Sequence, residues 1–275
     1  MGNPWLTRRV LNYAHQGGTL EAPSSTLYAL HRALEVGATA LELDVHQTRD
    51  GHLIVAHDTT VDRLTNGQGA ICDLELATLR ELDAAYRFAL EQEPNTFPFR
   101  GRGPMDPEFR MPTVDEVLEA FPRTFLNFDV KSGADNAPAC ARALARKLKP
   151  HAEHVIVASF DDTLTDVVRD EVHELGTSIG TMGAMAVWQA VSEGSPFPEL
   201  PHVALQLPAK FEGAEVITAP LIARAHEAGF PVHAWTINDA AEMERLLALD
   251  IDGLISDRPS VVAKVLAKSG RAYRP

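Results

Sequence analysis

Short strand-like runs alternate with helical runs along most of this chain, and this alternation constrains the fold more than any other feature. Strands separated by helices predict a parallel sheet with crossover helices. Eight parallel strands in 275 residues favour a (β/α)₈ TIM barrel over an open doubly wound sheet. We predict these strands at residues 11–15, 40–45, 125–131, 155–160, 177–182, 203–207, 232–237 and 253–256. We predict helices at residues 24–36, 113–121, 137–148, 162–175, 218–228 and 240–249.

Residues 59–110 interrupt the alternation. This segment is rich in turn-forming residues and contains at most one or two short helices. We therefore predict one domain over residues 1–275, in which 59–110 is an inserted cap that follows a β-hairpin on the second strand. A loop of this length is usually functional or disordered, so we expect the cap to shape access to a site. Its Phe97, Phe99 and Phe109 are candidates for an acyl-binding surface, although packing against the barrel is the favoured interpretation.

The composition excludes some classes of partner and compartment. A formal net charge of -13 argues against nucleic acid, because phosphate backbones require basic patches. A small phosphate-bearing substrate in a metal-lined pocket remains compatible with this charge. The first ten residues lack the apolar stretch of a signal peptide, and no transmembrane segment is predicted. Cys72 and Cys140 form no disulfide framework, so we expect a soluble cytoplasmic protein.

One hairpin brings acidic and imidazole groups together. Residues 40–48 alternate apolar and polar, Asp50-Gly51 is a two-residue turn signal, and residues 53–58 alternate again. Counting outward from that turn pairs Asp44 with His57. Directly paired residues point to one side of a sheet, and Glu42 is two residues from Asp44. We therefore expect Glu42, Asp44 and His57 to converge.

A third carboxylate joins this group from another predicted strand. In residues 125–131, Asn127, Asp129 and Lys131 share one face. Carboxylates without cysteines or clustered histidines suit one divalent Ca²⁺ or Mg²⁺ ion better than Zn²⁺. The alternative is that Asp129 and Lys131 form a solvated, mutually paired strand end. Three carboxylates at one predicted barrel rim favour the metal site, with Glu42, Asp44 and Asp129 as ligands.

Two histidines and a tryptophan complete the candidate site. His15 ends the first predicted strand, and His57 lies on the hairpin. Two imidazoles with pKa values near neutrality can act as general base and general acid across one scissile bond. Trp235, at the end of a later strand, is a candidate apolar wall for a substrate. His46 is left out, because strand alternation is expected to turn it away from Asp44.

The chain resembles the glycerophosphodiester phosphodiesterase family in an ordered set of motifs that spans nearly its whole length. Each motif is weakly specific by itself, but their order makes the set highly specific. The matching stretches are 15–18 (HQGG), 23–26 (PSST), 41–45 (LELDV), 48–51 (TRDG), 56–58 (AHD), 62–67 (DRLTNG), 129–131 (DVK), 159–160 (SF), 235–238 (WTIN) and 255–259 (ISDRP).

This resemblance implies a metal-dependent barrel enzyme of lipid metabolism that hydrolyses glycerophosphodiesters to glycerol 3-phosphate and an alcohol. In the family mechanism the glycerol 2-hydroxyl attacks phosphorus, and water opens the resulting cyclic phosphate. The positions matching Glu42, Asp44 and Asp129 bind Ca²⁺ or Mg²⁺, and His15 and His57 match the acid/base pair. Lys131 is implied to neutralise the phosphoryl oxygens.

The chain departs from the family pattern at three positions. Gln16 stands where the family has arginine, so a neutral hydrogen-bonding side chain replaces a cation that grips phosphate, and Gln16 is the candidate substrate-binding residue at this position. Ser24 replaces a glutamate and is a plausible helix N-cap. Asp129 replaces a longer glutamate among the ligands. These departures bear on the choice of substrate more than on the reaction type.

Two alternative functions stay open. One is a lysophospholipase D, which the segment 110–130 and the aromatic cap favour slightly through their similarity to the lipid-active branch of the family. The other is a barrel that binds phosphodiesters without turnover, which Gln16 suggests. The presence of both His15 and His57 argues against it, since binding alone needs no proton-transfer pair.

Overall fold

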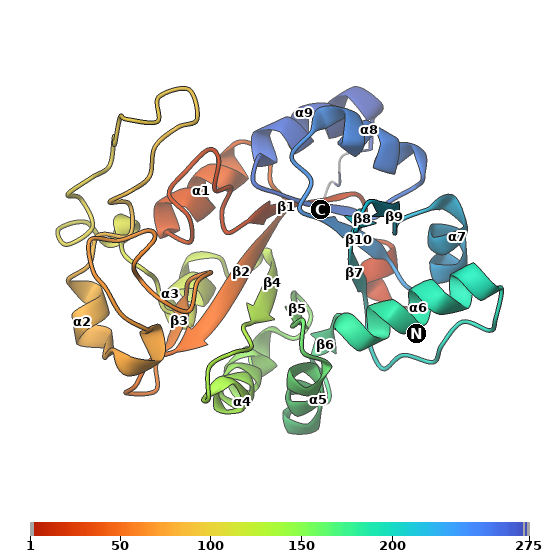
Figure 1. The fold of residues 1–275 in the computed structure, drawn as a ribbon, viewed down its shortest axis with the longest axis horizontal. Coiled ribbons are helices and arrows are strands. Elements are labelled where there is room, and N and C mark those ends of the chain that lie inside the picture. Colours follow the sequence, from red (N-terminus) through yellow and green to blue (C-terminus); the bar gives the residue numbers. More distant parts are fainter. Residues whose placement is uncertain (1–2, 272, 274–275) are drawn as a thin grey trace.

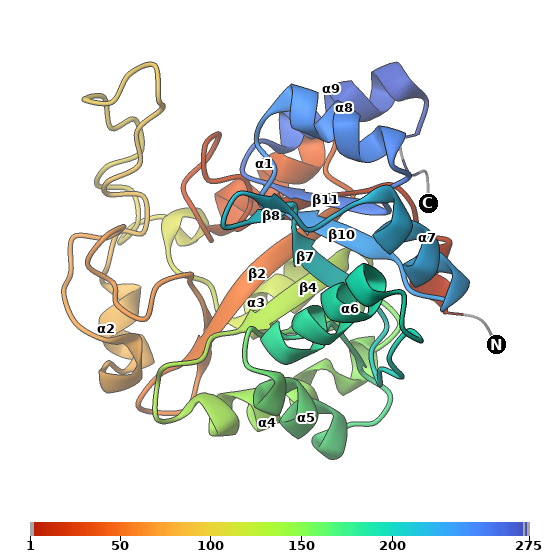
Figure 2. The same ribbon diagram turned by 45° about the vertical axis from the view of Figure 1, so that its right-hand side comes forward.

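A computed structural model describes residues 3–271 and 273, and it shows the expected parallel barrel (Figures 1 and 2). Eight parallel strands lie in the order β6-β5-β4-β2-β1-β11-β10-β7, with the short β3 antiparallel to β2. An isolated parallel bridge between Ser178 and Ala204 links the two ends of this order. The strand bounds are β1 Leu11–His15, β2 Ala40–Gln47, β3 Leu53–Val55, β4 Phe125–Val130, β5 Val155–Ala158, β6 Gly176–Thr177, β7 Leu205–Pro208, β10 Val232–Trp235 and β11 Gly253–Ser256.

Helices surround the strands and connect most of them (Figure 2). Most begin at a polar residue whose side chain accepts a bond from a free backbone N–H, such as Thr26, Thr113 and Asp161. Their bounds are α1 Leu27–Glu35, α2 Leu76–Arg80, α3 Val114–Ala120, α4 Ala137–Leu148, α5 Asp162–Glu171, α6 Thr181–Glu193, α7 Ala219–Glu227, α8 Ala240–Ala248 and α9 Pro259–Ser269. A small hairpin of β8 (Lys210–Phe211) and β9 (Ala214–Glu215) precedes α7.

Strand alternation divides each barrel strand between the outer core and the interior. On β2, Leu41, Leu43 and Val45 belong to the buried cluster between sheet and helices. The intervening Glu42 and Asp44 therefore face the barrel interior. This division brings the polar groups of the strand ends into one space.

The hairpin on β2 differs by one residue from the predicted register. Val45 pairs with Val55, and Thr48 N–H donates to the His52 carbonyl at 2.9 Å, so the loop has three residues. Gly51, at φ +87°, supplies the left-handed conformation that such a loop requires. Asp44 therefore lies opposite Ala56, whose N–H donates to the Asp44 carbonyl at 3.0 Å, and the predicted direct pairing with His57 is wrong.

The segment predicted as a strand over 177–182 is mostly not a strand. β6 ends at Thr177, and α6 begins at Thr181. A short apolar run such as residues 177–182 is compatible with either a strand or a buried helix. Here its last two residues begin α6, which extends to Glu193. Helix α9, which starts with Pro259 in its first turn, is also absent from the prediction.

Residues 59–110 form a long excursion with one short α-helix, and they lie beside the barrel (Figure 1, orange and yellow). Ile71 and Leu79 of this segment pack with Ile54 of β3 in a separate small apolar cluster. Phe109 is buried, and its ring stacks on Tyr28 of α1. Packing against the barrel, the favoured interpretation for Phe109, is therefore what the structure shows. None of the helices formed by residues 3–271 combines the length and apolarity needed to cross a bilayer.

Candidate active site

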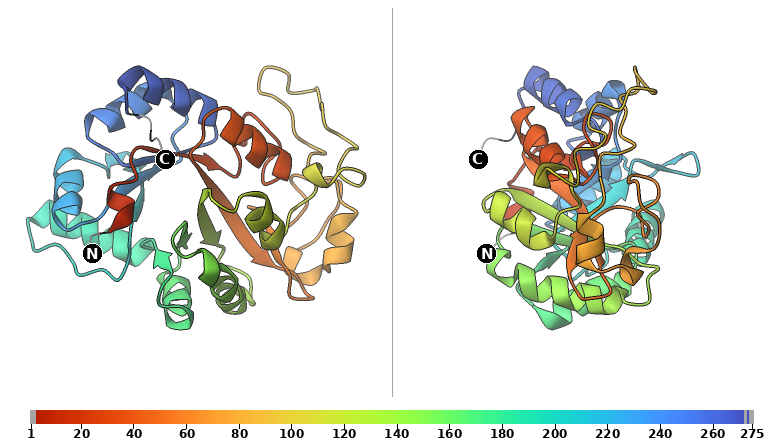
Figure 3. Two further views of the ribbon diagram at one scale, coloured as in Figure 1. Left: turned by 180° about the vertical axis from the view of Figure 1, so that it is seen from behind. Right: turned by 90° about the vertical axis from the view of Figure 1, so that its left-hand side faces the viewer.

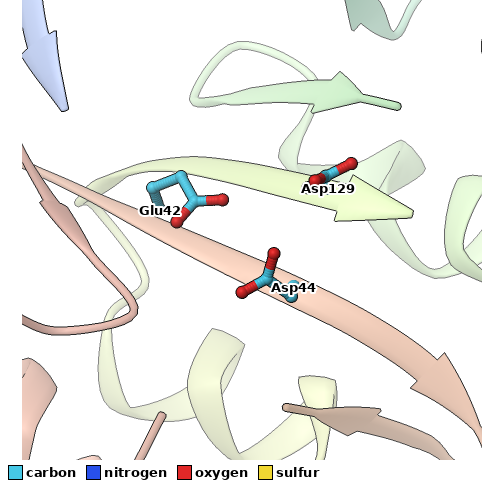
Figure 4. A group of neighbouring side chains, drawn as sticks. All are labelled: Glu42, Asp44 and Asp129. Atoms are coloured by element: carbon cyan, nitrogen blue, oxygen red, sulfur yellow. The ribbon is translucent and has the colours of Figure 1, made fainter. Parts of the chain in front are cut away.

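Three carboxylates meet at the ends of β2 and β4. In the parallel register Asp44 lies directly beside Asp129, and Glu42 lies one pleat before Asp44 on the same face. Figure 4 shows Glu42 and Asp44 along β2, with Asp129 on the neighbouring strand. One oxygen from each of the three lies within 4.8 Å of the others. The predicted convergence of these carboxylates is therefore present in the structure.

The donor set fits a hard divalent cation. Asp44 Oδ2 and Asp129 Oδ1 are buried and have no hydrogen-bond partner. Burial and the nearby Asp44 charge raise the pKa of Glu42. Three carboxylates crowded in a buried space repel one another, and a cation bound between them would remove that repulsion. Oxygen-only ligands are those that Ca²⁺ and Mg²⁺ prefer.

Lys131 bridges two of these carboxylates. Its Nζ lies 2.6 Å from Asp44 Oδ1 and 2.7 Å from Asp129 Oδ2. Burial alone would lower the pKa of Lys131, but the two negative charges outweigh that effect and raise it. The lysine is therefore a permanent cation at the edge of the acidic cluster.

His15 is held in the site by a carboxylate that directly follows the last barrel strand. In the β1–β2 register His15 lies beside Glu42, with Nε2 and Oε2 3.8 Å apart. Its Nδ1 lies 2.6 Å from Asp257 Oδ1, and Asp257 also accepts bonds from Thr19 and Asn238. Burial disfavours the imidazolium, but the charge of Glu42 and the bond to Asp257 raise the pKa of His15 to about 9.

His57 reaches the same site although it lies outside the strand ladder. β3 ends at Val55 and the chain bends, which brings the His57 ring to 6.1 Å from the His15 ring, centroid to centroid. Asp58 Oδ1 lies 2.8 Å from His57 Nδ1. Arg63 donates two hydrogen bonds to Asp58, and these lower the pKa of Asp58 to about 2. Each candidate histidine thus has its own ionised partner, and in each the Nε2 is the nitrogen that the partner leaves free.

Sequence reasoning did not assign these orienting residues, although signals for them exist. Asp257 directly follows β11, and the C-terminal ends of barrel strands meet at one rim. Asp58 is adjacent to His57 in the sequence. The reason for leaving out His46 was wrong, because residues two apart on a strand share a face, but His46 does not line the cavity. His46 is buried, and its Nε2 lies 3.2 Å from the His57 carbonyl oxygen, where an N–H would support the bend that carries His57.

Gln16 lies beside His15 and the acidic cluster, and its backbone N–H donates to Glu42 Oε2 at 3.3 Å. Its Nε2 is 3.0 Å from His15 Nε2, and its Oε1 accepts a bond from the Ser24 hydroxyl at 2.7 Å. Ser24 does not cap α1, because that role belongs to Thr26, whose side chain accepts from Ala29 N–H. The two departures from the family pattern are thus hydrogen-bonded to each other. Contact between Gln16 and a phosphate stays a prediction.

A cavity of about 680 Å³ opens over the carboxylates and both histidines. Lys131 and Trp235 also line it, so the predicted substrate-binding lysine and tryptophan face the same space. The Trp235 ring meets the Phe160 ring edge to face, with centroids 5.4 Å apart. The cavity wall contains no residue of the 59–110 segment among those that the structure describes. Its apolar side is formed by Phe160, Ile179, Met185, Trp188, Leu207, Phe211, Val216 and Trp235.

Fold and site together define a TIM-barrel enzyme whose active site lies at the C-terminal ends of the strands. Comparison with protein families identifies which one. The model of the "Glycerophosphoryl diester phosphodiesterase family" matches residues 15–261. The chain therefore belongs to this family and is a phosphodiesterase, which sets aside a barrel that only binds.

Relatives and solved structures agree with this assignment. A glycerophosphodiester phosphodiesterase of Caldanaerobacter subterraneus subsp. tengcongensis is 31% identical over 95% of this chain and 100% of the relative. One from Bacillus subtilis is 28% identical over 96% and 89%. The glycerophosphoryl diester phosphodiesterase domain of a Mycobacterium tuberculosis protein shares the fold, with TM-score 0.79, 18% identity and coverage of 93% and 98%. An Oleispira antarctica phosphodiesterase solved in complex with the product sn-glycerol-3-phosphate has TM-score 0.71, 24% identity and coverage of 93% and 96%.

Proposed function

We propose that this enzyme hydrolyses glycerophosphodiesters to glycerol 3-phosphate and an alcohol, with one bound Ca²⁺ or Mg²⁺ ion. The observation that carries the proposal is the placement of three crowded, partly unpartnered carboxylates beside two separately oriented histidines. The bound product in the Oleispira antarctica relative supports the substrate class.

Glu42, Asp44 and Asp129 would hold the cation, with the unpartnered oxygens of the two aspartates as its first ligands. When bound, such an ion supplies positive charge to a phosphoryl oxygen and lowers the pKa of a coordinated hydroxyl. Lys131 would place a second positive charge beside the same oxygens.

His15 and His57 would move the protons of the reaction. One Nε2 takes the proton of the glycerol 2-hydroxyl as its oxygen bonds to phosphorus. The other Nε2 donates a proton to the alcohol oxygen as its bond to phosphorus breaks. Water then opens the cyclic phosphate, with the two roles exchanged. Asp257 and Asp58 keep each Nδ1 engaged, which holds the ring orientations during both steps.

A lysophospholipid is the second candidate substrate, and the apolar side of the cavity favours it. The support lies in Met185, Trp188 and Phe211, which offer a wall for an acyl chain beside the polar centre. Because no described residue of the 59–110 segment lines the cavity, the aromatic residues of that segment are no longer the argument for this activity. Trp235 would form the part of the wall nearest to the glycerol unit.

The deciding experiment is an assay of the purified protein with glycerophosphocholine and, separately, with lysophosphatidylcholine. Product is measured after treatment with chelator, and again after Ca²⁺ or Mg²⁺ is added back. We expect no turnover with chelator and restored turnover with one of the two ions. The substrate with the higher kcat/KM identifies which of the two activities dominates. Turnover that persists in chelator would refute metal dependence, and failure of both substrates with both ions would refute the proposed function.

A further inference from the structure

Exposed apolar side chains gather at the mouth of the cavity. Among the residues that the structure describes, seven large apolar side chains are exposed, and five of them come from three neighbouring segments at this mouth. We call these five the apolar rim; their exposures lie between 48% and 67%, and they are Phe160, Met182, Met185, Trp188 and Phe211. Single exposed apolar residues are normal on a protein surface, but a contiguous group marks an interaction site.

The apolar rim is continuous with the cavity wall. Phe160, Met185, Trp188 and Phe211 each line the cavity as well as being exposed. Met182, Met185 and Trp188 follow one another at three-residue spacing on α6, so they lie on one broad side of that helix. Phe211 is carried by the β8–β9 hairpin, which stands out from the end of the barrel in the right-hand view of Figure 3.

Polar contacts hold the segments of the apolar rim in place. The Phe160 carbonyl accepts bonds from the N–H and the hydroxyl of Thr181, at 3.0 and 2.8 Å. Asp162 accepts from Met182 N–H at 2.8 Å and Gly183 N–H at 3.1 Å. A side chain on Gly180 would meet the Asp162 carboxyl at 2.7 Å, so α6 approaches α5 closely. These contacts join two of the three rim segments, the Phe160 loop and α6, within the chain itself.

We propose that the apolar rim docks on a zwitterionic lipid surface. The position of the rim at the cavity mouth indicates what binds there. A folded protein or a second copy of the chain on the rim would block the entry of substrate into the cavity. A lipid surface would instead deliver amphiphilic substrate through that mouth. Exposed methionine, phenylalanine and tryptophan are side chains that enter the boundary between lipid chains and headgroups.

Charge selects the kind of lipid surface. The five rim residues carry no charge, and the neighbouring Lys210 and Glu215 pair with each other at 3.0 Å. The chain as a whole has a formal charge of -13, which would repel anionic headgroups at low ionic strength. Docking therefore depends on apolar insertion, and neutral headgroups permit it. The proposal rests on the proposed function only for the identity of what enters the cavity.

The test is cosedimentation of the protein with phosphatidylcholine vesicles. The wild type is compared with Met182→Ser/Trp188→Ser, and the control is Met105→Ser/Leu90→Ser. Among the residues that the structure describes, Met105 and Leu90 are the two exposed large apolar side chains outside the rim. Melting temperatures of all three proteins establish that each is folded. Binding is measured in chelator, without turnover, so a failed hydrolysis assay and a failed vesicle assay are separate results.

We expect the vesicle partition coefficient of the rim variant to be at least about tenfold lower than that of the wild type, because two apolar side chains no longer leave water on binding. The control should bind like the wild type. Vesicles containing phosphatidylglycerol should bind the wild type less at low salt than at high salt. The proposal is overturned if the wild type does not sediment with vesicles or if the rim variant binds equally well. It is also overturned if the wild type forms a dimer that the rim variant does not.

Discussion

At the scale of single residues, the two candidate histidines are made unequal by their surroundings. His15 is flanked by Glu42 and Asp257, whose negative charges raise its pKa to about 9. His57 is more exposed and shares Asp58 with Arg63. A cation held by Glu42 would weaken the negative field that acts on His15. The electrostatics of the pair are therefore linked to the carboxylate cluster.

Removal of either imidazole should abolish most turnover while leaving the fold intact. We expect His15→Ala and His57→Ala each to lower kcat by about 10² to 10⁴, the usual contribution of a positioned acid or base. Steady-state assays with glycerophosphocholine measure this effect, and metal titration should give nearly unchanged affinity. Asp239→Asn is a matched control, because it keeps a helix cap at an exposed position. Near-normal turnover in either alanine variant would remove that histidine from the proposed mechanism.

At the scale of elements, the turn between β1 and α1 sets the position of His15. Gly17 follows the strand at φ +83°, and its N–H donates to the Ala14 carbonyl at 3.2 Å. A Cβ at this position would lie 2.8 Å from Ala29 Cβ in α1. The turn therefore requires glycine for two reasons, the left-handed backbone and the close approach of the helix.

Two glycines allow the destabilisation caused by a left-handed backbone to be measured apart from that caused by the close approach of α1. Gly133 also has a positive φ, +96°, but nothing lies within 4 Å of a Cβ built there. Gly133→Ala should lower the free energy of unfolding by about 1 to 2 kcal/mol through backbone strain alone. Gly17→Ala should lower the free energy of unfolding by about 1 to 3 kcal/mol more than Gly133→Ala, because the new methyl group would clash with Ala29. It should also reduce kcat by moving His15. Denaturant unfolding measures both; equal losses would show that α1 moves aside freely.

At the scale of the whole molecule, the buried carboxylates of the active site repel one another, and this repulsion opposes folding. The acidic cluster joins β2 and β4 in the middle of the barrel sheet, and its carboxylates are buried. Their mutual repulsion therefore acts across two central strands. Proteins that bind an ion only when folded gain stability with ion concentration.

Metal should raise the melting temperature of the enzyme. At an ion concentration about one hundred times the Kd, we expect about 2.7 kcal/mol of stabilisation, which corresponds to several degrees. Thermal unfolding with chelator, Ca²⁺ and Mg²⁺ measures this shift. Asp44→Asn should remove most of it, whereas Asp62→Asn, which changes an exposed carboxylate, should not. A shift of equal size in Asp44→Asn would place the ion elsewhere.

Local pattern was enough to predict much of this protein. Alternation and helix caps located most strands and helices, and α4 was predicted at its observed bounds. Polar residues at strand ends marked Glu42, Asp44, Asp129 and His15, because parallel strands bring their C-terminal ends to one rim. These features depend on neighbours in the sequence or on a rule common to all barrels.

Only the tertiary structure decided the rest, because it depends on contacts that no local pattern encodes. The hairpin loop, with Gly51 in a left-handed conformation, is one residue longer than predicted. This shift of one residue in register places Asp44 opposite Ala56 instead of His57. His57 reaches the site through a bend beyond β3, and His15 is oriented by Asp257, 242 positions away. The apolar rim joins α6 to the loop between β5 and α5 and to the β8–β9 hairpin. Sequence determined which groups are available, and packing determined which of them meet.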